Sequence, residues 1–288
     1  MPLLQVIVLA IVQGLAELLP VSSSAHVIVA AKLMGLDPAA PQFTLLLVML
    51  HTGTMFAVIV YFWRSWRETY FKSVVAFKRF AALVILATVL TAIIGEAIIK
   101  IIERTAFPGV PHAQIEDLFG HLEIIAPALA AVGVLILIAG IWERRRRAPG
   151  AGAREMSAMQ AALIGAVQGL CLPFRGFSRS GATISVGMLA GIAKSRAESF
   201  SFALAVVLTP PVVARELLRL MDAQKIERTA DLAAAVLPSL LGAVFAFLAG
   251  LVALRWLSRW LERGRWYVFG IYCLLAAAAV AALHVSGY

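Results

Sequence analysis

Two short polar segments interrupt long apolar runs in this sequence, and their residue types could carry chemistry. Residues 13–26 read QGLAELLPVSSSAH, and residues 171–183 read CLPFRGFSRSGAT. A carboxylate, a histidine and arginines are costly among apolar neighbours, and at membrane depth such groups are a functional hypothesis by default. We therefore interpret the two segments as the working parts of the chain.

The first segment places a carboxylate next to a predicted helix break. Gln13 and Glu17 are four residues apart, so they would share one face of a helix, and Pro20 would end that helix. Glu17 could hold a divalent cation that neutralises an anionic substrate. Gln13 is then a candidate substrate-binding residue beside it.

A serine cluster and a histidine follow the same break. Ser22 could cap the next half-helix, while Ser23 and His26, three residues apart on it, could approach each other. A histidine near a hydroxyl is the usual arrangement for activating a nucleophile. The alternative is that a serine only caps the helix and that His26 makes a structural hydrogen bond. Because Glu17 lies beside them, we favour catalysis by Ser23 and His26, with Ser22 binding substrate.

The second segment is rich in Gly, Ser and Arg, and it leads into a half-helix predicted to begin near Ala182. Helix N-termini and exposed backbone N–H groups bind phosphate. Arg179 adds a planar cation whose donors match phosphate oxygens. The candidate substrate-binding residues of this segment are Ser178, Ser180 and Gly181.

Together these side chains suit hydrolysis of a phosphate ester or a pyrophosphate. Glu17 would hold the cation, Arg179 would stabilise developing charge, and a serine, or a water placed by it, would attack phosphorus. The alternative is a structural ion pair between Arg179 and Glu17, since ion pairs inside membranes also occur without catalysis.

The elements that must position these residues are predicted to be membrane helices. Apolar residues make up 61% of the 288 positions and charged residues 14%, against about half and a quarter in a soluble domain. Runs of about 20 apolar residues are long enough to cross a bilayer. Six qualify: 43–63, 80–102, 122–142, 199–221, 233–257 and 267–286. The fold class is therefore an all-α polytopic membrane protein with six transmembrane helices.

Two further apolar stretches, 2–36 and 156–194, are broken by the polar segments. Each predicts a re-entrant pair of half-length helices, because broken helices at membrane depth persist only where they line protein or a wet cavity. The cysteines Cys171 and Cys273 have neither disulfide-framework nor metal-ligand spacing.

The basic residues predict an orientation. The net charge is +9, but the basic residues cluster in short gaps between apolar runs, which favours membrane topology over a nucleic-acid partner. The gaps 64–79 and 143–155 each hold five Lys or Arg residues and are predicted to be cytoplasmic, with both chain termini outside.

A weak internal repeat relates the two broken pairs. Gln13-Gly14-Leu15 recurs as Gln168-Gly169-Leu170. We predict one membrane domain over 1–288, built from inverted halves of about 1–142 and 156–288 that the basic loop 143–155 joins. In inverted repeats with broken helices the working site lies near the midplane, where the breaks meet.

The paired motifs resemble those of the undecaprenyl-diphosphate phosphatases of the bacitracin-resistance type. The resemblance covers essentially the whole chain and includes the segments 51–54 and 198–202. By motif position, it places Gln13 and Glu17 at the family's (E/Q)xxxE pair, Ser23 at its proposed nucleophile, His26 at its motif histidine and Arg179 in its S-R-S-G loop. Three positions depart from the common pattern, at Gln13, Ala25 and Arg175.

The resemblance implies an enzyme of the bacterial cytoplasmic (inner) membrane whose active site opens to the periplasm. It would hydrolyse undecaprenyl diphosphate to the monophosphate, use a divalent cation such as Mg²⁺ or Ca²⁺, recycle the carrier for cell-wall synthesis and confer bacitracin resistance. Its expected partners are the lipid diphosphate and membrane lipids, with a homodimer as a candidate assembly and no nucleic acid.

The alternative is a lipid-phosphate transporter or flippase that uses the same midplane pocket without hydrolysis, because inverted repeats and broken helices are also typical of transporters. Release of phosphate by the pure protein would separate the two functions.

Overall fold

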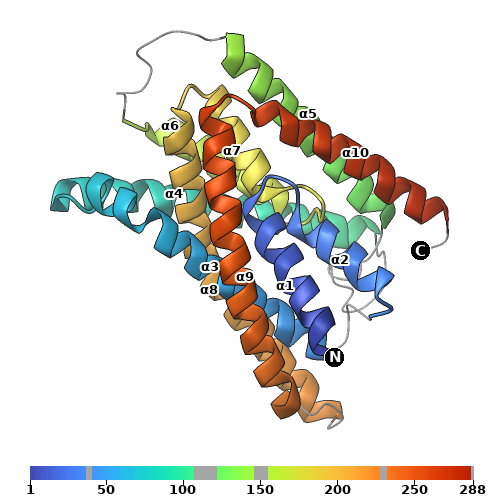
Figure 1. Ribbon diagram of the computed structural model, residues 1–288. Helices are drawn as coiled ribbons and strands as arrows, with labels where there is room; N and C mark the ends of the chain where they lie inside the picture. The colour runs from blue at the N-terminus through green and yellow to red at the C-terminus, as the bar shows by residue number, and fades with distance from the viewer. Residues whose placement is uncertain (37–40, 107–121, 146–154, 228–231, 287–288) are drawn as a thin grey trace. The chain divides into compact units, whose positions relative to one another are not determined.

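The computed structural model describes residues 1–36, 41–106, 122–145, 155–227 and 232–286, and these are helical apart from short turns (Figure 1). The helices are α1 (Leu3–Leu18), α2 (Ser23–Leu33), α3 (Pro41–Thr69), α4 (Val74–Ala106), α5 (Leu122–Arg145), α6 (Ala158–Cys171), α7 (Arg179–Leu189), α8 (Lys194–Glu227), α9 (Leu232–Glu262) and α10 (Trp266–Val285). The predicted all-α class is confirmed.

Six of these helices, α3, α4, α5, α8, α9 and α10, are long and apolar enough to cross a membrane. Each overlaps one of the six predicted runs, so the chain is a multi-pass membrane protein. Several helices are longer than their apolar runs: α4 begins at Val74, and its apolar run begins at residue 80. The extra turns carry charged residues, which can continue a helix beyond the apolar layer.

The two interrupted stretches each form a pair of shorter helices, α1 with α2 and α6 with α7. At the first break, Leu19 is extended (ψ 152°) and Pro20 follows it. A residue before proline is disfavoured in the helical region, which explains why α1 ends there. The broken helices are confirmed; their re-entrant course stays a prediction.

The chain divides into two compact units, and neither unit corresponds to one half of the sequence. Unit 1 contains 1–19, 23–63 and 205–257, and unit 2 contains 20–22, 64–204 and 258–288. Both units therefore collect segments from before and after the loop 143–155, of which 146–154 lie outside the described residues. The inverted halves stay a prediction.

Unit 1 has an apolar core formed by α1, α2, α3 and α9. Its fully buried members include Leu9, Val27, Phe43 and Leu50. The helices approach through small residues: a Cβ built on Gly14 of α1 would lie 2.6 Å from the carbonyl oxygen of Ala246. Close backbone approach at small residues is how membrane helices pack.

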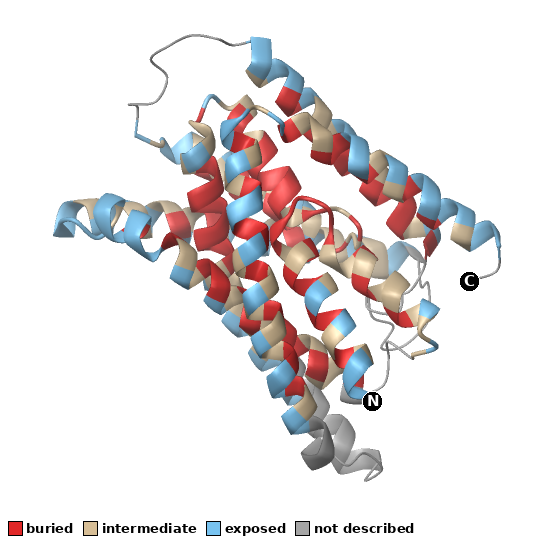
Figure 2. Ribbon diagram, viewed as in Figure 1, coloured by how far each residue is buried: buried red, intermediate tan, exposed pale blue. Residues whose placement is uncertain are grey.

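The helices of unit 2 also approach one another closely at glycine residues. α5 and α10 lie side by side (Figure 1), and a Cβ on Gly140 of α5 would lie 2.6 Å from the backbone nitrogen of Tyr267. α6 packs against α4, where a Cβ on Gly165 would lie 2.3 Å from the carbonyl oxygen of Ala87. In Figure 2 the buried residues of α5 and α10 lie on their facing sides and exposed residues on the outer sides.

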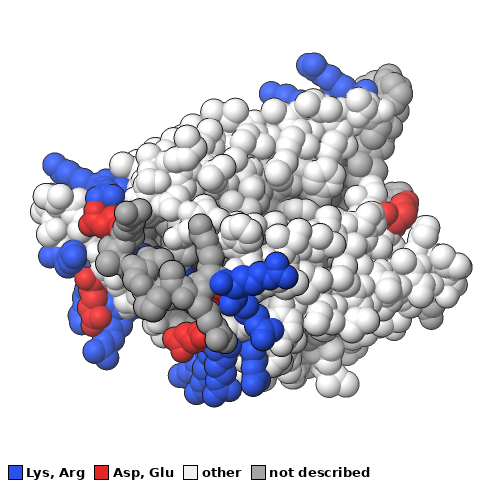
Figure 3. All heavy atoms as spheres, turned by 90° about the horizontal axis from the view of Figure 1, so that it is seen from above, with Lys and Arg blue, Asp and Glu red and all other residues white. Residues whose placement is uncertain are grey.

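The outward surfaces are largely apolar, as lipid contact requires. Large apolar side chains such as Val60, Ile85, Ile93 and Leu275 are exposed. Lys and Arg gather in a few groups on the face shown in Figure 3, and most of that face is uncharged. A soluble protein would rarely expose so much apolar surface.

Candidate active site

Glu17 lies in the last turn of α1, directly before the chain breaks at Leu19 and Pro20. The side chain of Glu17 is 14% exposed. A carboxylate in such a place needs polar partners, because burying an unpaired charge is costly. The partners come from α1 itself and from two other elements of unit 1, α2 and α3.

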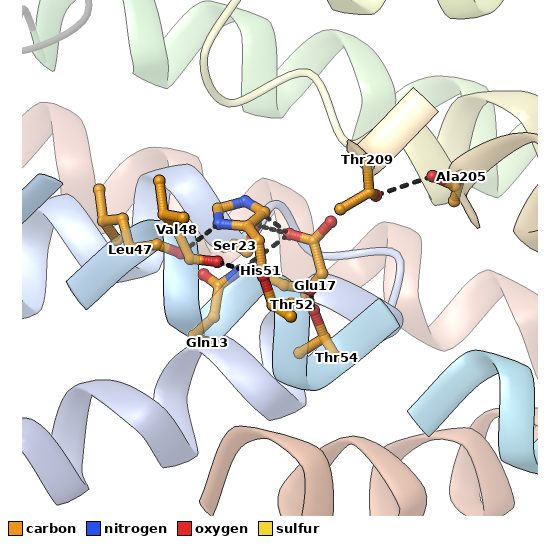
Figure 4. Close-up of polar contacts among 10 residues, drawn as sticks. All are labelled: Gln13, Glu17, Ser23, Leu47, Val48, His51, Thr52, Thr54, Ala205 and Thr209. Atoms are coloured by element: carbon orange, nitrogen blue, oxygen red, sulfur yellow. Dashed lines mark hydrogen bonds and ion pairs between the residues drawn. The ribbon is translucent and has the colours of Figure 1, made fainter. Parts of the chain in front are cut away.

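Three side chains converge on the same oxygen of Glu17 (Figure 4). Gln13 Nε2 donates to Glu17 Oε2 at 3.2 Å, and Ser23 Oγ donates to it at 2.5 Å. His51 Nε2 lies 3.7 Å from that oxygen. The predicted i,i+4 pairing of Gln13 with Glu17 is present, and the helix break lets Ser23, the first residue of α2, turn back to the carboxylate.

His51 was missed as a site residue by the sequence reasoning, although its segment entered the family resemblance. It lies on α3, inside a membrane-spanning helix, with its side chain 33% exposed. Its Nδ1 is 2.8 Å from the carbonyl oxygen of Leu47, one turn earlier in α3. An ionisable residue inside a membrane helix is a functional signal on its own, and that signal could have identified His51.

The other two predicted residues at the first break precede and follow Ser23 in the chain, Ser22 in unit 2 and His26 in unit 1. Ser22 is buried and directly precedes α2, the position of a cap, but its φ of 67° is left-handed instead of the extended conformation usual for a cap. His26 is half-buried on α2, one turn after Ser23. His51 lies beside Glu17, with Nε2 3.7 Å from Oε2. The catalytic assignment of His26 stays a prediction.

At the second break, α7 begins at Arg179, three residues before the predicted start near Ala182. The reason is a cap: Ser178 Oγ accepts a hydrogen bond from the backbone nitrogen of Gly181 at 3.2 Å. Ser180 lies within the first turn, with its Oγ 3.4 Å from that of Ser178. Arg179 is thus the first residue of α7, in the same turn as the backbone N–H groups at the start of the helix.

A polar network in unit 2 holds α7 behind its N-terminus. Thr183 Oγ1 donates to the carbonyl oxygen of Arg179 at 2.8 Å and lies 2.5 Å from Ser201 Oγ of α8. Trp266 Nε1 of α10 donates to Ser185 Oγ at 2.9 Å. Buried and satisfied networks of this kind fix one arrangement of the helices they join.

Gly176 supplies the turn that leads into α7. Its φ is 100°, a conformation that L side chains rarely adopt, and a Cβ there would lie 2.5 Å from the carbonyl oxygen of Ile125. Only glycine fits both the dihedral and the space. Arg175, just before it, is half-buried, as is Arg179.

The first break spans both compact units, because its turn, residues 20–22, belongs to unit 2 together with the second break. Gln13, Glu17 and Ser23 lie in unit 1, whereas Ser178, Arg179 and the rest of the second motif lie in unit 2. Within unit 2, a Cβ on Gly181 would lie 3.3 Å from Pro20 Cβ, so the turn of the first break contacts the start of α7. That Glu17 and Arg179 meet at one site stays a prediction.

Glu17 has the chemistry of a ligand for a hard divalent cation, which takes carboxylate oxygens. A carboxylate offers about four acceptor positions, so the hydrogen bonds from Gln13 and Ser23 do not by themselves exclude a cation. Within the described part of the chain, no three His, Cys, Asp or Glu side chains form a metal-binding group. A cation at Glu17 would thus also need phosphate oxygens of the substrate, as Mg²⁺ commonly does.

Comparisons with known proteins agree across almost the whole chain. A family model described as "Bacitracin resistance protein BacA" matches residues 6–279. A protein of Acinetobacter baylyi named "Undecaprenyl-diphosphatase 2" is 55% identical over 98% of each chain. Proteins named "Undecaprenyl-diphosphatase" from Desulfosudis oleivorans and Rhodopirellula baltica are 32% and 30% identical, covering 94% and 98% of this chain and 95% and 98% of their own.

Proposed function

The chain belongs to the bacitracin resistance protein BacA family, and from this we propose that it hydrolyses undecaprenyl diphosphate to undecaprenyl phosphate and inorganic phosphate. It is an undecaprenyl-diphosphate phosphatase of the membrane, which returns the lipid carrier to cell-wall synthesis and so counters bacitracin. The observation that carries this function is the Ser23 hydroxyl donating to the Glu17 carboxylate at a helix break.

The roles of the residues follow from this geometry. Ser23 Oγ is proposed to attack the terminal phosphorus while Glu17 Oε2 accepts the hydroxyl proton. The bond from that phosphorus to the bridging oxygen breaks, and undecaprenyl phosphate leaves with the bridging oxygen. Water then hydrolyses the phosphoserine and releases inorganic phosphate. A water bound by Ser23 could attack directly by the same proton transfer, and Gln13 keeps the carboxylate oriented in either case.

The second motif is proposed to bind phosphate. Arg179 supplies a guanidinium that can make two parallel hydrogen bonds to phosphate oxygens. Ser178, Ser180 and Gly181 form the first turn of α7 and its cap, and such helix N-termini favour anions. Preorganised donors of this kind stabilise charge that develops in a transition state.

A divalent cation, Mg²⁺ or Ca²⁺, is proposed to bind at Glu17 together with substrate phosphate oxygens. When bound, it would neutralise phosphate charge and polarise the phosphorus. The support is electrostatic: a diphosphate carries several negative charges, and one arginine is too little to balance them in a medium of low dielectric constant.

The enzyme is proposed to lie in the bacterial cytoplasmic (inner) membrane with its active site open to the periplasm. The support is the excess of basic residues in the gaps 64–79 and 143–155, which predicts a cytoplasmic location for those gaps.

The deciding experiment is phosphate release by the purified protein in detergent from undecaprenyl diphosphate, with and without excess chelator. We expect release that stops with chelator and returns with added Mg²⁺ or Ca²⁺. A protein that binds the lipid without releasing phosphate would contradict hydrolysis. Full activity in chelator would contradict only the cation requirement.

A further inference from the structure

We infer that His51 is a second protein ligand of the divalent cation proposed at Glu17, binding it through Nε2. This inference rests on the proposed function, because it assumes the cation site. It begins from the ring orientation of His51 within unit 1, where α1, α2 and α3 bring Glu17, Ser23 and His51 together (Figure 4).

The hydrogen bond at the other side of the ring identifies the tautomer. A backbone carbonyl oxygen can only accept, so His51 Nδ1, 2.8 Å from the oxygen of Leu47, must carry the proton. In the neutral ring, Nε2 then presents a lone pair. Histidines that bind metals almost always donate their second ring N–H in this way, often to a backbone carbonyl, and that bond fixes both tautomer and orientation.

The second step is what Nε2 faces. It lies 3.7 Å from Glu17 Oε2, so in the neutral ring two lone-pair donors face each other across a gap too long for a direct hydrogen bond. A cation between them would bind both atoms, and because Oε2 already accepts from Gln13 and Ser23, one of these two hydrogen bonds would give way to it. With bond lengths of about 2.0–2.2 Å, this separation corresponds to an angle of roughly 115–135° at the cation, so the two side chains would move a few tenths of an ångström closer together on binding it.

The third step is the rest of the ligand set. Glu17 and His51 are two protein ligands, and no third His, Cys, Asp or Glu joins them among the described residues. Such a site keeps several positions for water and substrate oxygens, which suits a cation that must engage a diphosphate. Mn²⁺, which like Mg²⁺ suits carboxylate and water ligands, serves as the spectroscopically visible substitute for the proposed cation.

The experiment measures Mn²⁺ binding to the purified protein by electron paramagnetic resonance, alone and with methylenediphosphonate as an uncleavable diphosphate. Spin-echo envelope modulation on bound Mn²⁺ reports a directly bound imidazole nitrogen. His51→Gln keeps an amide near the position of Nε2 and removes that nitrogen. His284→Gln is the matched control, because His284 Nδ1 also lies 3.6 Å from a carboxylate oxygen, that of Glu123, on exposed helix ends.

We expect nitrogen modulation in the wild type and in His284→Gln, and none in His51→Gln. The affinity of His51→Gln for Mn²⁺ should fall by roughly tenfold or more, since even residues that only orient a metal ligand are worth 10- to 100-fold. The melting temperature without metal should be unchanged, which shows that the loss is one of a ligand and not of the fold.

Other outcomes overturn the inference in distinguishable ways. Mn²⁺ that binds, and is released by Glu17→Gln, but shows no nitrogen modulation would exclude His51 and leave the cation at Glu17. Modulation that survives in His51→Gln and disappears in His26→Gln would assign the ligand to His26. Mn²⁺ that is indifferent to Glu17→Gln would overturn the cation site itself, whereas phosphate release by the wild type would still support the phosphatase.

Discussion

Three polar side chains of unit 1 lie around one carboxylate oxygen of Glu17. Gln13 and Ser23 both donate to Oε2, and His51 lies beside it. Of these three residues, only Ser23 has a hydroxyl that could attack phosphorus. Its hydroxyl already donates a hydrogen bond to the carboxylate that would accept the proton. We therefore assign Gln13 the role of orienting the carboxylate and Ser23 the role of the reacting group.

The first prediction concerns this carboxylate. Glu17→Gln keeps the size of the side chain but removes both the proton acceptor and the charge that would hold a cation. Turnover should fall by roughly 10²–10⁴-fold, the usual contribution of a general base. Phosphate release measures the loss, and an unchanged elution profile in detergent shows that the protein is folded. Turnover near that of the wild type would remove Glu17 from the mechanism.

The second prediction concerns the guanidinium of Arg179. Arg179→Lys keeps the charge and loses the bidentate geometry, so turnover should fall by about two orders of magnitude, comparable to removing one charge-stabilising donor elsewhere. If Arg179 instead serves only stability, lysine should be partly tolerated and Arg179→Ala should chiefly lower the melting temperature. Turnover and melting temperature measured on both variants separate the two roles.

At the scale of the elements, two helix starts in unit 2 offer a matched comparison. Ser178 caps α7, and Ser157 caps α6 in a reciprocal bond pair with Gln160. Only α7 carries a proposed catalytic residue in its first turn. A cap affects helix stability in both cases, but it should affect phosphate binding only at α7.

The third prediction uses this pair. Ser178→Ala and Ser157→Ala should each destabilise the protein by about 1 kcal/mol, the typical value of a cap. Only Ser178→Ala should also reduce turnover, because Arg179 and the N–H groups of the first turn lose their fixed positions. Equal turnover in the two variants, at equal melting temperature, would contradict a role for the start of α7.

The packing of α3 on α9 is the second element-scale feature that the site depends on. A Cβ on Gly53, two residues after His51, would lie 2.2 Å from the backbone oxygen of Ala243. A Cβ on Gly95 would lie 2.5 Å from Leu172 Cδ1. An added Cβ at Gly53 would meet backbone, which cannot move aside. An added Cβ at Gly95 would meet the end of a flexible leucine side chain, which can.

The fourth prediction follows from that difference. Gly53→Ala should destabilise the protein by about 1–3 kcal/mol, the usual cost of overpacking, although alanine is intrinsically the better helix former. It should also reduce turnover, because α3 carries His51. Gly95→Ala should change the melting temperature little. A Gly53→Ala protein as stable and active as the wild type would show that α3 and α9 are not held at this distance.

For the whole molecule, the open question is orientation in the membrane. The membrane-spanning helices are identified by length and composition. These properties are the same whether the chain termini lie outside the cell or in the cytoplasm. The bias of basic residues toward alternate gaps selects one of these, because Lys and Arg are retained on the cytoplasmic side during insertion.

The fifth prediction tests this choice. In a background of Cys171→Ser and Cys273→Ala, a membrane-impermeant thiol reagent added to intact cells should label Ser286→Cys and not Lys72→Cys. Both positions are exposed, Lys72 between α3 and α4 and Ser286 after α10. Permeabilised cells provide the control in which both are labelled. The reverse pattern in intact cells would invert the topology.

The sequence by itself determined the class of the molecule and most of the chemistry at the first break. Helices are the form in which a single apolar segment satisfies its own backbone groups in lipid, so six apolar runs were enough to predict six spans. Gln13 and Glu17 pair because they lie four residues apart on one helix. Pro20 predicts the break because its ring disfavours a helical conformation of the residue before it. These are local effects, and a local pattern is sufficient to predict them.

Only the tertiary structure decided which side chains from distant segments reach Glu17. His51 lies 34 positions later in the chain and approaches because α1 and α3 share an apolar core and both pack on α9 through small residues. No spacing rule connects residues on different helices, so the sequence favoured His26, which is nearer in the chain. The start of α7 at Arg179 likewise depends on which Ser178 rotamer accepts from Gly181. Contacts between segments depend on packing, and packing is a property of the folded chain.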